Sequence, residues 1–256
     1  MKANYHTHTW RCGHAKGTER EYVEAAIARG HEILGFSDHS PYPFPWYHHS
    51  FIRMRCDQLA DYAETVTGLR NEFRGTIDIK LGVEAEYYPA YFSQLRSMLS
   101  DHGVAYMILG QHYLDNEILS HYSGKSTSDS KHLEQYCRQC RDAMQTGLFS
   151  YFAHPDLIRF TGDDAIYTRH IRQLCREAKD CGIPLEINLL GIEANKHYPN
   201  RRFWEIAAEE GCHVILGCDT HNPAALLDHA SEEKALALIG ELGLVLIPEL
   251  ELRAIE

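Results

Sequence analysis

The sequence has no hydrophobic run long enough to cross a membrane. No stretch of 18 consecutive apolar residues occurs in the 256 residues, which argues against a transmembrane helix. The first residues also lack the basic segment followed by an apolar segment that is typical of a secretory leader. We therefore expect a cytoplasmic protein without a membrane partner.

Cysteine is present, but it lacks the arrangement of a disulfide framework or a zinc ribbon. The eight cysteines are scattered along the chain. Cys137 and Cys140 form one C-x-x-C pair in a predicted helix, and no second pair lies at the spacing of a structural zinc site. We interpret the cysteines as reduced, mostly buried thiols.

Positive charge is scarce. The chain has 25 Lys and Arg residues against 36 Asp and Glu residues, which gives a formal net charge of −11. Because affinity for nucleic acid comes largely from Lys and Arg, this balance argues against nucleic-acid binding. A small anionic substrate stays possible, because bound divalent cations would reverse the local field.

The chain also lacks a linker, a charge run or an internal repeat that would divide it. Short apolar segments alternate with helical patterns, and the first helix begins at a capping box, Thr18 to Glu21. This alternation predicts an α/β fold, a distorted seven-stranded (β/α) barrel made by one domain over residues 1–256. The predicted strands cover residues 2–6, 31–37, 77–84, 105–112, 151–153, 184–188 and 213–218.

Three further segments have distinct patterns. Residues 51–73 have the periodicity of one long helix. Residues 113–130 are polar and contain Gly, Ser and Thr, which predicts a long loop of the kind that covers a site. Residues 244–247 are predicted as an apolar tail.

Histidine is what the sequence has in excess, with 17 residues. His6, His8 and His14 lie within nine residues, directly after a short apolar lead-in. If residues 3–8 form a strand, side chains alternate between its faces, and His6 and His8 point the same way. Two converging imidazoles favour a metal site, with a histidine-rich surface loop as the alternative for this stretch alone.

Residues of metal-ligand type recur where the predicted strands end. In an α/β barrel the carboxyl ends of the strands share one face, and that face carries the active site. Such residues are too many for one ion of about four ligands and suit three ions, with a carboxylate bridging two of them. We therefore expect nine residues to converge as metal ligands: His6, His8, His14, His39, Glu84, His112, His154, Asp219 and His221.

In their order along the chain, these motifs resemble the polymerase and histidinol phosphatase (PHP) superfamily. The matching segments are H-T-H at 6–8, the histidine at 14, S-D-H at 37–39, G-V-E at 82–84, G-Q-H at 110–112, A-H-P at 153–155 and C-D-T-H at 218–221. The resemblance implies a distorted seven-stranded barrel with a trinuclear centre of divalent metal ions. The nitrogen and oxygen ligands suit zinc, iron or manganese, and affinity order alone does not choose among them.

The resemblance also implies which residues hold each ion. The first set is His6, His8, Glu84 and Asp219. In the second set, Glu84 bridges to an ion that is also held by His112 and His154. The third set is His14, His39 and His221.

Within the superfamily, the chain length and the run L-E-I-N at 185–188 resemble the stand-alone histidinol-phosphate phosphatases. The run H-P-D-L-I-R is similar too, and it places Arg159 where those enzymes have an arginine that binds the substrate phosphate. One departure is Glu193, which stands where those enzymes have a second basic residue and which would also suit a substrate with an ammonium group. The candidates to replace that basic residue are Lys196, Arg201 and Arg202.

The resulting hypothesis is metal-assisted hydrolysis of a phosphate monoester, with L-histidinol phosphate, an intermediate of histidine biosynthesis, as the first candidate. Divalent ions lower the pKa of water from 15.7 towards ~7, so that hydroxide attacks phosphorus. Arg159 would pair with phosphate through its planar guanidinium, and Lys196 is the second substrate-binding candidate. Asp38 would either orient a metal ligand or protonate the leaving group.

Three other functions stay open on the sequence. One is a PHP phosphoesterase that acts on another monoester, a cyclic phosphate or a nucleic-acid end, the last of which the acidic charge balance disfavours. The second is a phosphotyrosine phosphatase, for which an open, protein-sized mouth would be the sign. The third is a metal-binding protein without catalysis. The sequence carries no signal for the oligomeric state.

Overall fold

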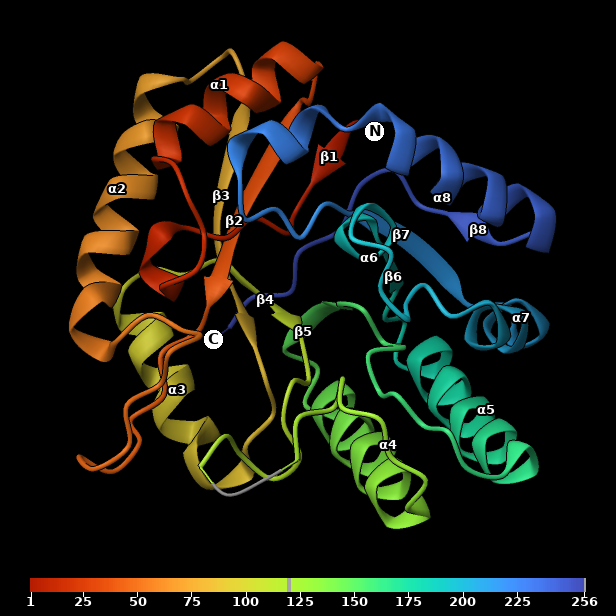
Figure 1. Cartoon of the computed structure of the whole chain (residues 1–256). Helices are drawn as coiled ribbons and strands as arrows, with labels where there is room; N and C mark the ends of the chain where they lie inside the picture. The colour runs from red at the N-terminus through yellow and green to blue at the C-terminus, as the bar shows by residue number, and fades with distance from the viewer. Residues whose placement is uncertain (119–120, 256) are drawn as a thin grey trace.

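The computed structural model describes residues 1–118 and 121–255. Its centre is a curled sheet whose neighbouring strands are all parallel and are hydrogen-bonded in chain order from β1 to β8, and helices lie around its outside (Figure 1). The strands are β1 (Ala3–Asn4), β2 (Ile33–His39), β3 (Asp78–Ala85), β4 (Tyr106–Leu109), β5 (Phe149–Phe152), β6 (Leu185–Asn188), β7 (His213–Gly217) and β8 (Val245–Leu246).

The helices fill the connections between strands, as right-handed crossovers between parallel strands require. The α-helices are α1 (Glu19–Arg29), α2 (Leu59–Glu72), α3 (Pro89–Asp101), α4 (Ser130–Gln145), α5 (Asp164–Asp180), α6 (Leu189–Glu193), α7 (Arg201–Glu210) and α8 (His229–Leu242). Three short 3₁₀ helices are η1 (Trp10–Cys12), η2 (Cys56–Gln58) and η3 (Pro223–Leu227). Among the described residues, no helix is both long and apolar enough to span a membrane.

Local sequence signals set the helix ends. The predicted capping box at the start of α1 is present, with Thr18 and Glu21 each bonding the other's backbone, and Gly30 ends the helix in the left-handed conformation. Other helices begin at a capping carboxylate, as Asp163 does for α5 and Asp228 for α8. These caps fix where each helix returns the chain to the sheet.

The strands read as continuous apolar runs because both of their faces are covered. All residues of β2, β4, β5 and β6 are buried, as expected for parallel strands between helices and a filled interior. The main hydrophobic cluster extends from Tyr22 on α1 to Ile255. The polar residues at the strand ends are therefore held on a rigid support.

An α/β fold with parallel strands is confirmed, but the sheet contains eight strands and the prediction of seven was wrong. Each predicted strand overlaps one of β1 to β7, whereas the predicted apolar tail contains β8. A two-residue strand has no alternation or turn signal to identify it. A parallel bridge joins Thr7 to Thr220, so that the segment after β1 lies beside the segment after β7.

The predicted long helix over residues 51–73 was also wrong at its start. Only Leu59–Glu72 is α-helical, preceded by the short η2. Residues 40–55 are irregular, and the extended backbone at Arg55 interrupts the predicted helix. The predicted loop 113–130 has no helix or strand in its described part before α4 begins at Ser130. Residues 119 and 120 of that loop lie outside the described residues.

Candidate metal centre

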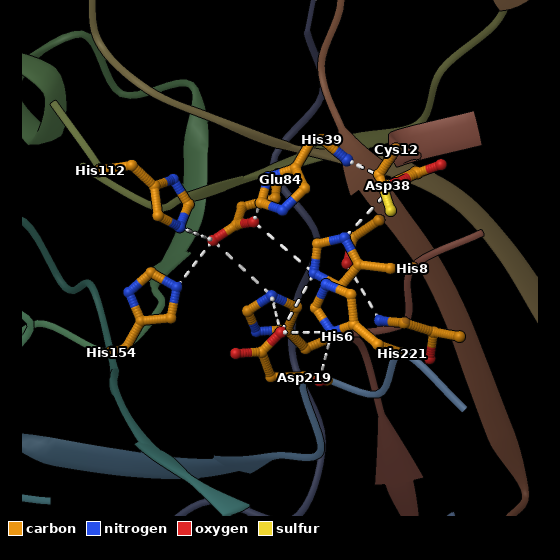
Figure 2. Close-up of polar contacts among 12 residues, drawn as sticks. His6, His8, Cys12, Asp38, His39, Glu84, His112, His154, Asp219 and His221 are labelled. Atoms are coloured by element: carbon orange, nitrogen blue, oxygen red, sulfur yellow. Dashed lines mark hydrogen bonds and ion pairs between the residues drawn. The ribbon is translucent and has the colours of Figure 1, made fainter. Parts of the chain in front are cut away.

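Eight of the nine predicted ligands come from the carboxyl ends of the strands and lie together in Figure 2, and the ring of His14 lies beside those of His39 and His221. His6 and His8 follow β1, His39 ends β2, and Glu84 lies near the end of β3. The others follow β4, β5 and β7 or, for His14, lie after η1. The strand register brings His39 and Glu84 together, because they are paired residues on the neighbouring strands β2 and β3.

Glu84 is the centre of the cluster, and its carboxylate is only 1% exposed. One oxygen, Oε1, lies 2.8 Å from Nε2 of His154 and 3.6 Å from Nε2 of both His6 and His112. The other, Oε2, lies 2.9 Å from Nδ1 of His39 and 3.6 Å from Nε2 of His8. One carboxylate thus faces five imidazoles, which is the arrangement expected of a bridging ligand.

Room for this carboxylate comes from a glycine. A Cβ atom at Gly110 would lie 1.9 Å from Oε1 of Glu84, so that no larger residue fits there without displacing it. Gly217 likewise leaves room for a second buried carboxylate, because a Cβ atom at Gly217 would lie 1.7 Å from Oε1 of Glu186. Both glycines allow the close approach of a charged side chain to a neighbouring strand.

Asp219 is the second carboxylate of the cluster. Its Oδ1 lies 3.1 Å from Nε2 of His8 and 3.5 Å from Nε2 of His6. Its Oδ2 accepts a hydrogen bond of 3.1 Å from the amide of Asn188. Asp219 and His154 also adopt the left-handed backbone conformation, with φ of 47° and 32°. Such strain in residues other than glycine concentrates at functional sites.

His14 and His221 extend the cluster towards solvent. The ring of His221 stacks on His8 at 4.1 Å between centroids and on His14 at 4.6 Å. The ring of His14 lies 5.4 Å from His39. The loop that follows η1 therefore carries the third histidine of the opening motif to the far side of His8.

Five overlapping groups of side chains have ligand atoms close enough to share a metal ion. They are His6–His8–Asp219, His6–Glu84–His154, His8–His39–Glu84, His14–His39–His221 and His8–Cys12–His221. Eight of the nine predicted ligands occur in these groups; His112 is absent from them, although its Nε2 lies 3.6 Å from Glu84. Cys12 was not predicted, because a buried cysteine carries no ligand signal of its own.

The donor atoms fit divalent metal ions. Buried polar atoms normally have hydrogen-bond partners, and a set of orphans needs an explanation. In this cluster the atoms without a hydrogen bond are Nε2 of His6, Nε2 of His8, Nδ1 of His39, Oε2 of Glu84, Nδ1 of His154 and Nε2 of His221. Nδ1 of His39 and Oε2 of Glu84 lie 2.9 Å apart but form no hydrogen bond with each other. Imidazole nitrogen and carboxylate oxygen are the donors that zinc and similar ions take.

The electrostatics of the cluster favour positive charge. Burial opposes protonation of His8, but the Asp219 and Asp38 carboxylates outweigh it and raise the pKa of His8 to about 9. Burial likewise opposes protonation of His6, yet Glu186 and the nearby carboxylates raise its pKa well above the ordinary value. Burial opposes ionisation of Glu84, but His112, His39 and His6 hold its pKa well below its ordinary value.

The outer imidazoles titrate in the opposite direction. Burial, followed by the charge on His8, lowers the pKa of His221 to about 3 and that of His39 well below its ordinary value. The same two causes lower the pKa of His14. Neutral imidazoles keep a lone pair for a metal, and metal binding would displace the protons of His6 and His8.

In His6 and His112, the ring nitrogen that faces away from the centre contacts a carboxylate that the sequence did not reveal. Nδ1 of His6 lies 2.8 Å from Oε1 of Glu186, and Nδ1 of His112 lies 3.0 Å from Oε1 of Glu86. Such contacts orient a metal-binding histidine and raise its basicity. The available signal was the alternation of strand residues, which places Glu86 on the same face as Glu84.

Asp38 lies beside His8 and is fully buried. Its Oδ1 is 3.4 Å from Nδ1 of His8 and accepts the backbone N–H of His39 at 2.9 Å, while its other oxygen accepts the hydroxyl of Thr9. Asp38 does not line the cavity that opens onto the cluster. This position favours the orienting role over protonation of a leaving group.

A cavity of about 260 Å³ opens onto the cluster. Six predicted ligands line it, and the rest of its wall comes from Ile52, Tyr113, Tyr122, Leu157, Leu190, Lys196 and Tyr198. Lys196 is the only lysine or arginine among the described lining residues, and its Nζ lies 3.1 Å from the hydroxyl of Tyr198. The cavity therefore combines one cation with an apolar and aromatic wall.

The other predicted basic residues lie elsewhere. Arg159 is exposed and does not line the cavity, and the same is true of Glu193. Arg201 pairs with Glu241 at 2.7 Å, and Arg202 pairs with Asp164 on α5. The structure thus brings Lys196 to the candidate centre and leaves Arg201 and Arg202 in ion pairs on the surface.

Comparison with known proteins gives a consistent family. The PHP domain model matches residues 4–189, which include seven of the nine predicted ligands. A probable histidinol-phosphatase of Deinococcus radiodurans is 32% identical over 229 residues, and the match covers 85% of each chain. The histidinol-phosphatase of Bacillus subtilis is 30% identical over 124 residues, which cover 47% of this chain and 43% of that protein.

A solved structure has a similar fold. It is the histidinol phosphate phosphatase of Lactococcus lactis, in complex with zinc, L-histidinol and phosphate. The TM-score is 0.75 with 22% sequence identity, and the superposition covers 99% of this chain and 97% of that chain. Asp219 and His221 lie beyond the residues matched by the family model, and their place among the other ligands comes from the structure.

Proposed function

The chain belongs to the PHP domain family, and from this premise we propose that it is a metal-dependent phosphatase that hydrolyses L-histidinol phosphate to L-histidinol and phosphate. The relatives named as histidinol-phosphatases support the substrate. The observation that carries the proposal is Glu84, a buried carboxylate with five imidazoles at 2.8 to 3.6 Å. Core packing gives no reason to gather these groups.

We infer that three divalent ions bind, held by the ligand sets that the family resemblance implies. Two observed groups, His6–His8–Asp219 and His14–His39–His221, support the first and third sets. His154 and His112, on the other side of Glu84, support the second. When bound, such ions supply positive charge to the phosphoryl oxygens and acidify water. Zinc, iron and manganese all suit these donors.

The chain's own residues bind and orient the substrate. Lys196 supplies a cation at the cavity wall and would pair with the phosphate. Arg159 is exposed and lies five residues after His154, and the family resemblance makes it the second candidate for the phosphate. Asp38 holds His8 in place, so that its Nε2 faces Asp219 and Glu84.

The size of the cavity favours a small substrate. A volume of about 260 Å³ suits a phosphate monoester with a short organic group. Its walls include the rings of Tyr113, Tyr122 and Tyr198, against which a flat heterocycle could stack. A phosphotyrosine in a folded protein would need a wider mouth.

The test is a phosphate-release assay with purified protein loaded in turn with zinc, manganese and iron(II). The substrates are L-histidinol phosphate, phosphotyrosine, a simple sugar phosphate and a cyclic nucleotide. We expect metal-dependent release, fastest from L-histidinol phosphate, and loss of both metal and activity in His8→Ala. A His8→Ala variant that keeps full activity would exclude the metal-dependent function. If phosphate is released faster from another ester, that ester would become the proposed substrate in place of L-histidinol phosphate.

A further inference from the structure

Arg53 is a buried arginine that lies next to the candidate metal centre without belonging to it. It is 4% exposed, although it lies in the irregular segment between β2 and α2. Its guanidinium donates to both oxygens of Glu86, at 2.8 and 2.9 Å, which is the bidentate geometry of a strong arginine–carboxylate pair. The ring of Tyr42 covers it, with 5.2 Å from Cζ to the ring centroid.

Glu86 connects this arginine to a predicted metal ligand. The oxygen that accepts Nη2 of Arg53, Oε1, also lies 3.0 Å from Nδ1 of His112. A carboxylate in that position fixes the ring plane and leaves Nε2 of His112 facing Glu84. Arg53 in turn leaves Glu86 little freedom to rotate, because it binds both carboxylate oxygens.

A second contact reaches another predicted ligand through the backbone. Nη1 of Arg53 donates to the carbonyl of Ser40 at 3.2 Å, and Ser40 directly follows His39. The N–H of Ser40 donates to the carbonyl of Glu84 at 2.8 Å. The guanidinium of Arg53 therefore contacts the backbone beside His39 on β2 and, through Glu86, the ring of His112 after β4.

The third contact joins two loops that border the cavity. Nε of Arg53 donates to Glu117 at 2.7 Å, and Glu117 lies in the long segment after β4. Ile52, the neighbour of Arg53, and Tyr113, which lies in the same segment as Glu117, both belong to the cavity wall. Without Arg53, the buried carboxylates of Glu86 and Glu117 would lose the cation between them.

From these contacts we propose that Arg53 is a positioning residue for the metal centre. It fixes Glu86 on His112 and the backbone beside His39, so that ligands from two strands keep the spacing that metal ions require. A buried ion pair is weak evidence for stability in itself, because desolvation offsets much of its attraction. Its value here lies in geometry. The proposal rests on the metal-dependent function proposed above.

The experiment measures metal binding as well as activity. Arg53→Met, Arg53→Lys and Glu86→Gln are equilibrated with buffered free zinc, and the bound metal is counted by mass spectrometry. The absorption bands of the cobalt-substituted proteins report the ligand geometry. We expect Arg53→Met and Glu86→Gln to need about 10- to 100-fold more free zinc for half-loading and to shift the cobalt bands. Arg53→Lys should bind zinc more tightly than Arg53→Met but less tightly than the wild type, because lysine keeps the positive charge without the bidentate geometry of the guanidinium.

Arg29→Met is the matched control. The Arg29 side chain is also largely buried and pairs with a carboxylate, Glu232, but this pair joins the last residue of α1 to α8 and includes no predicted ligand. We expect this variant to bind zinc as the wild type does. If Arg53→Met does not fold, as judged by circular dichroism, Glu86→Gln decides.

The outcomes separate this proposal from the proposed function. A wild-type protein that binds metal and hydrolyses phosphate, with Arg53→Met and Glu86→Gln unchanged in zinc affinity and cobalt spectrum, would overturn the positioning role alone. Equal loss of zinc in Arg29→Met would also overturn it, since the effect would then be general. A wild-type protein that binds no metal would overturn the proposed function and the positioning role together.

Discussion

Histidines are buried at both ends of the sheet, but their environments differ. At the carboxyl end, His8 is fully buried, and its pKa is raised to about 9 because Asp219 and Asp38 outweigh the effect of burial. At the amino end, His31 precedes β2 and is 4% exposed. Burial lowers its pKa to about 4, and the charges of the N-terminus and Arg29 act in the same direction.

The difference shows which groups make a cluster of buried histidines favourable for positive charge. Burial alone disfavours the charged imidazole, as it does for His31. At the carboxyl end, the carboxylates of Glu84, Asp219 and Glu186 reverse the direction for His6. Carboxylates outweigh burial for His6, whereas for His31 burial and the charges of the N-terminus and Arg29 outweigh Glu232. Four changes would break or sharpen this comparison.

The largest effect is expected from Glu84→Gln. The amide keeps the size of the side chain but removes the charge that faces five imidazoles. We expect at least one metal ion to be lost per chain and phosphate release to fall by about 1000-fold or more. Metal analysis and steady-state kinetics on L-histidinol phosphate measure both.

The control for this change is Glu64→Gln, which alters an exposed glutamate on α2. It should keep the metal and the activity of the wild type. A Glu84→Gln protein with its full metal complement and undiminished turnover would show that the central carboxylate is not what distinguishes the two ends of the sheet.

Glu186→Gln should have a smaller effect, because Glu186 contacts a ligand without facing the cavity. Its Oε1 lies 2.8 Å from Nδ1 of His6, and its Oε2 accepts the backbone N–H of His154 at 3.0 Å. We expect metal affinity to fall about 10- to 100-fold, as for other partners that orient a ligand histidine. Competition with a chelating dye measures the affinity. Glu193→Gln, which changes an exposed residue of α6, is the control, and its metal affinity should equal that of the wild type.

The sequence predicted well which side chains converge, because their signal is local and their meeting follows from topology; that they bind metal stays a prediction. Each lies at or after a strand end, and parallel strands place those ends together. The partners Glu186, Glu86 and Arg53 were missed because their roles depend on contacts between segments far apart in the chain. Arg53 and Glu86, for example, are 33 residues apart. The eighth strand was missed because two residues carry no periodicity.

The cavity at the carboxyl end contains one positive side chain, because Lys196 is the only lysine or arginine among its described lining residues. A charge-assisted hydrogen bond to phosphate is worth about 1.5 to 3 kcal/mol. We expect Lys196→Met to raise KM for L-histidinol phosphate by about 10-fold and to leave the metal content unchanged. Arg159→Met is the companion variant. A larger rise in KM there would assign the phosphate contact to Arg159, as the family resemblance implies.

The smallest effect concerns the amino end, through His31→Asn. The unfolded chain takes up a proton at His31 near the ordinary pKa of 6.5, whereas the folded protein does so only near 4. Stability from this group is therefore complete above pH 6.5 and is lost as the pH falls towards 4. Asparagine can still donate to the carbonyl of Met1, the partner of Nδ1 at 3.1 Å.

Between pH 7.5 and 5.5, urea unfolding of the wild type should show a loss of stability about 1 kcal/mol larger than that of His31→Asn. The exposed His102, changed to Asn, is the control and should keep the wild-type slope. If His31→Asn has the same slope as the wild type, burial does not disfavour the imidazolium at the amino end. The contrast between the two ends of the sheet would then have to come from the carboxyl end alone.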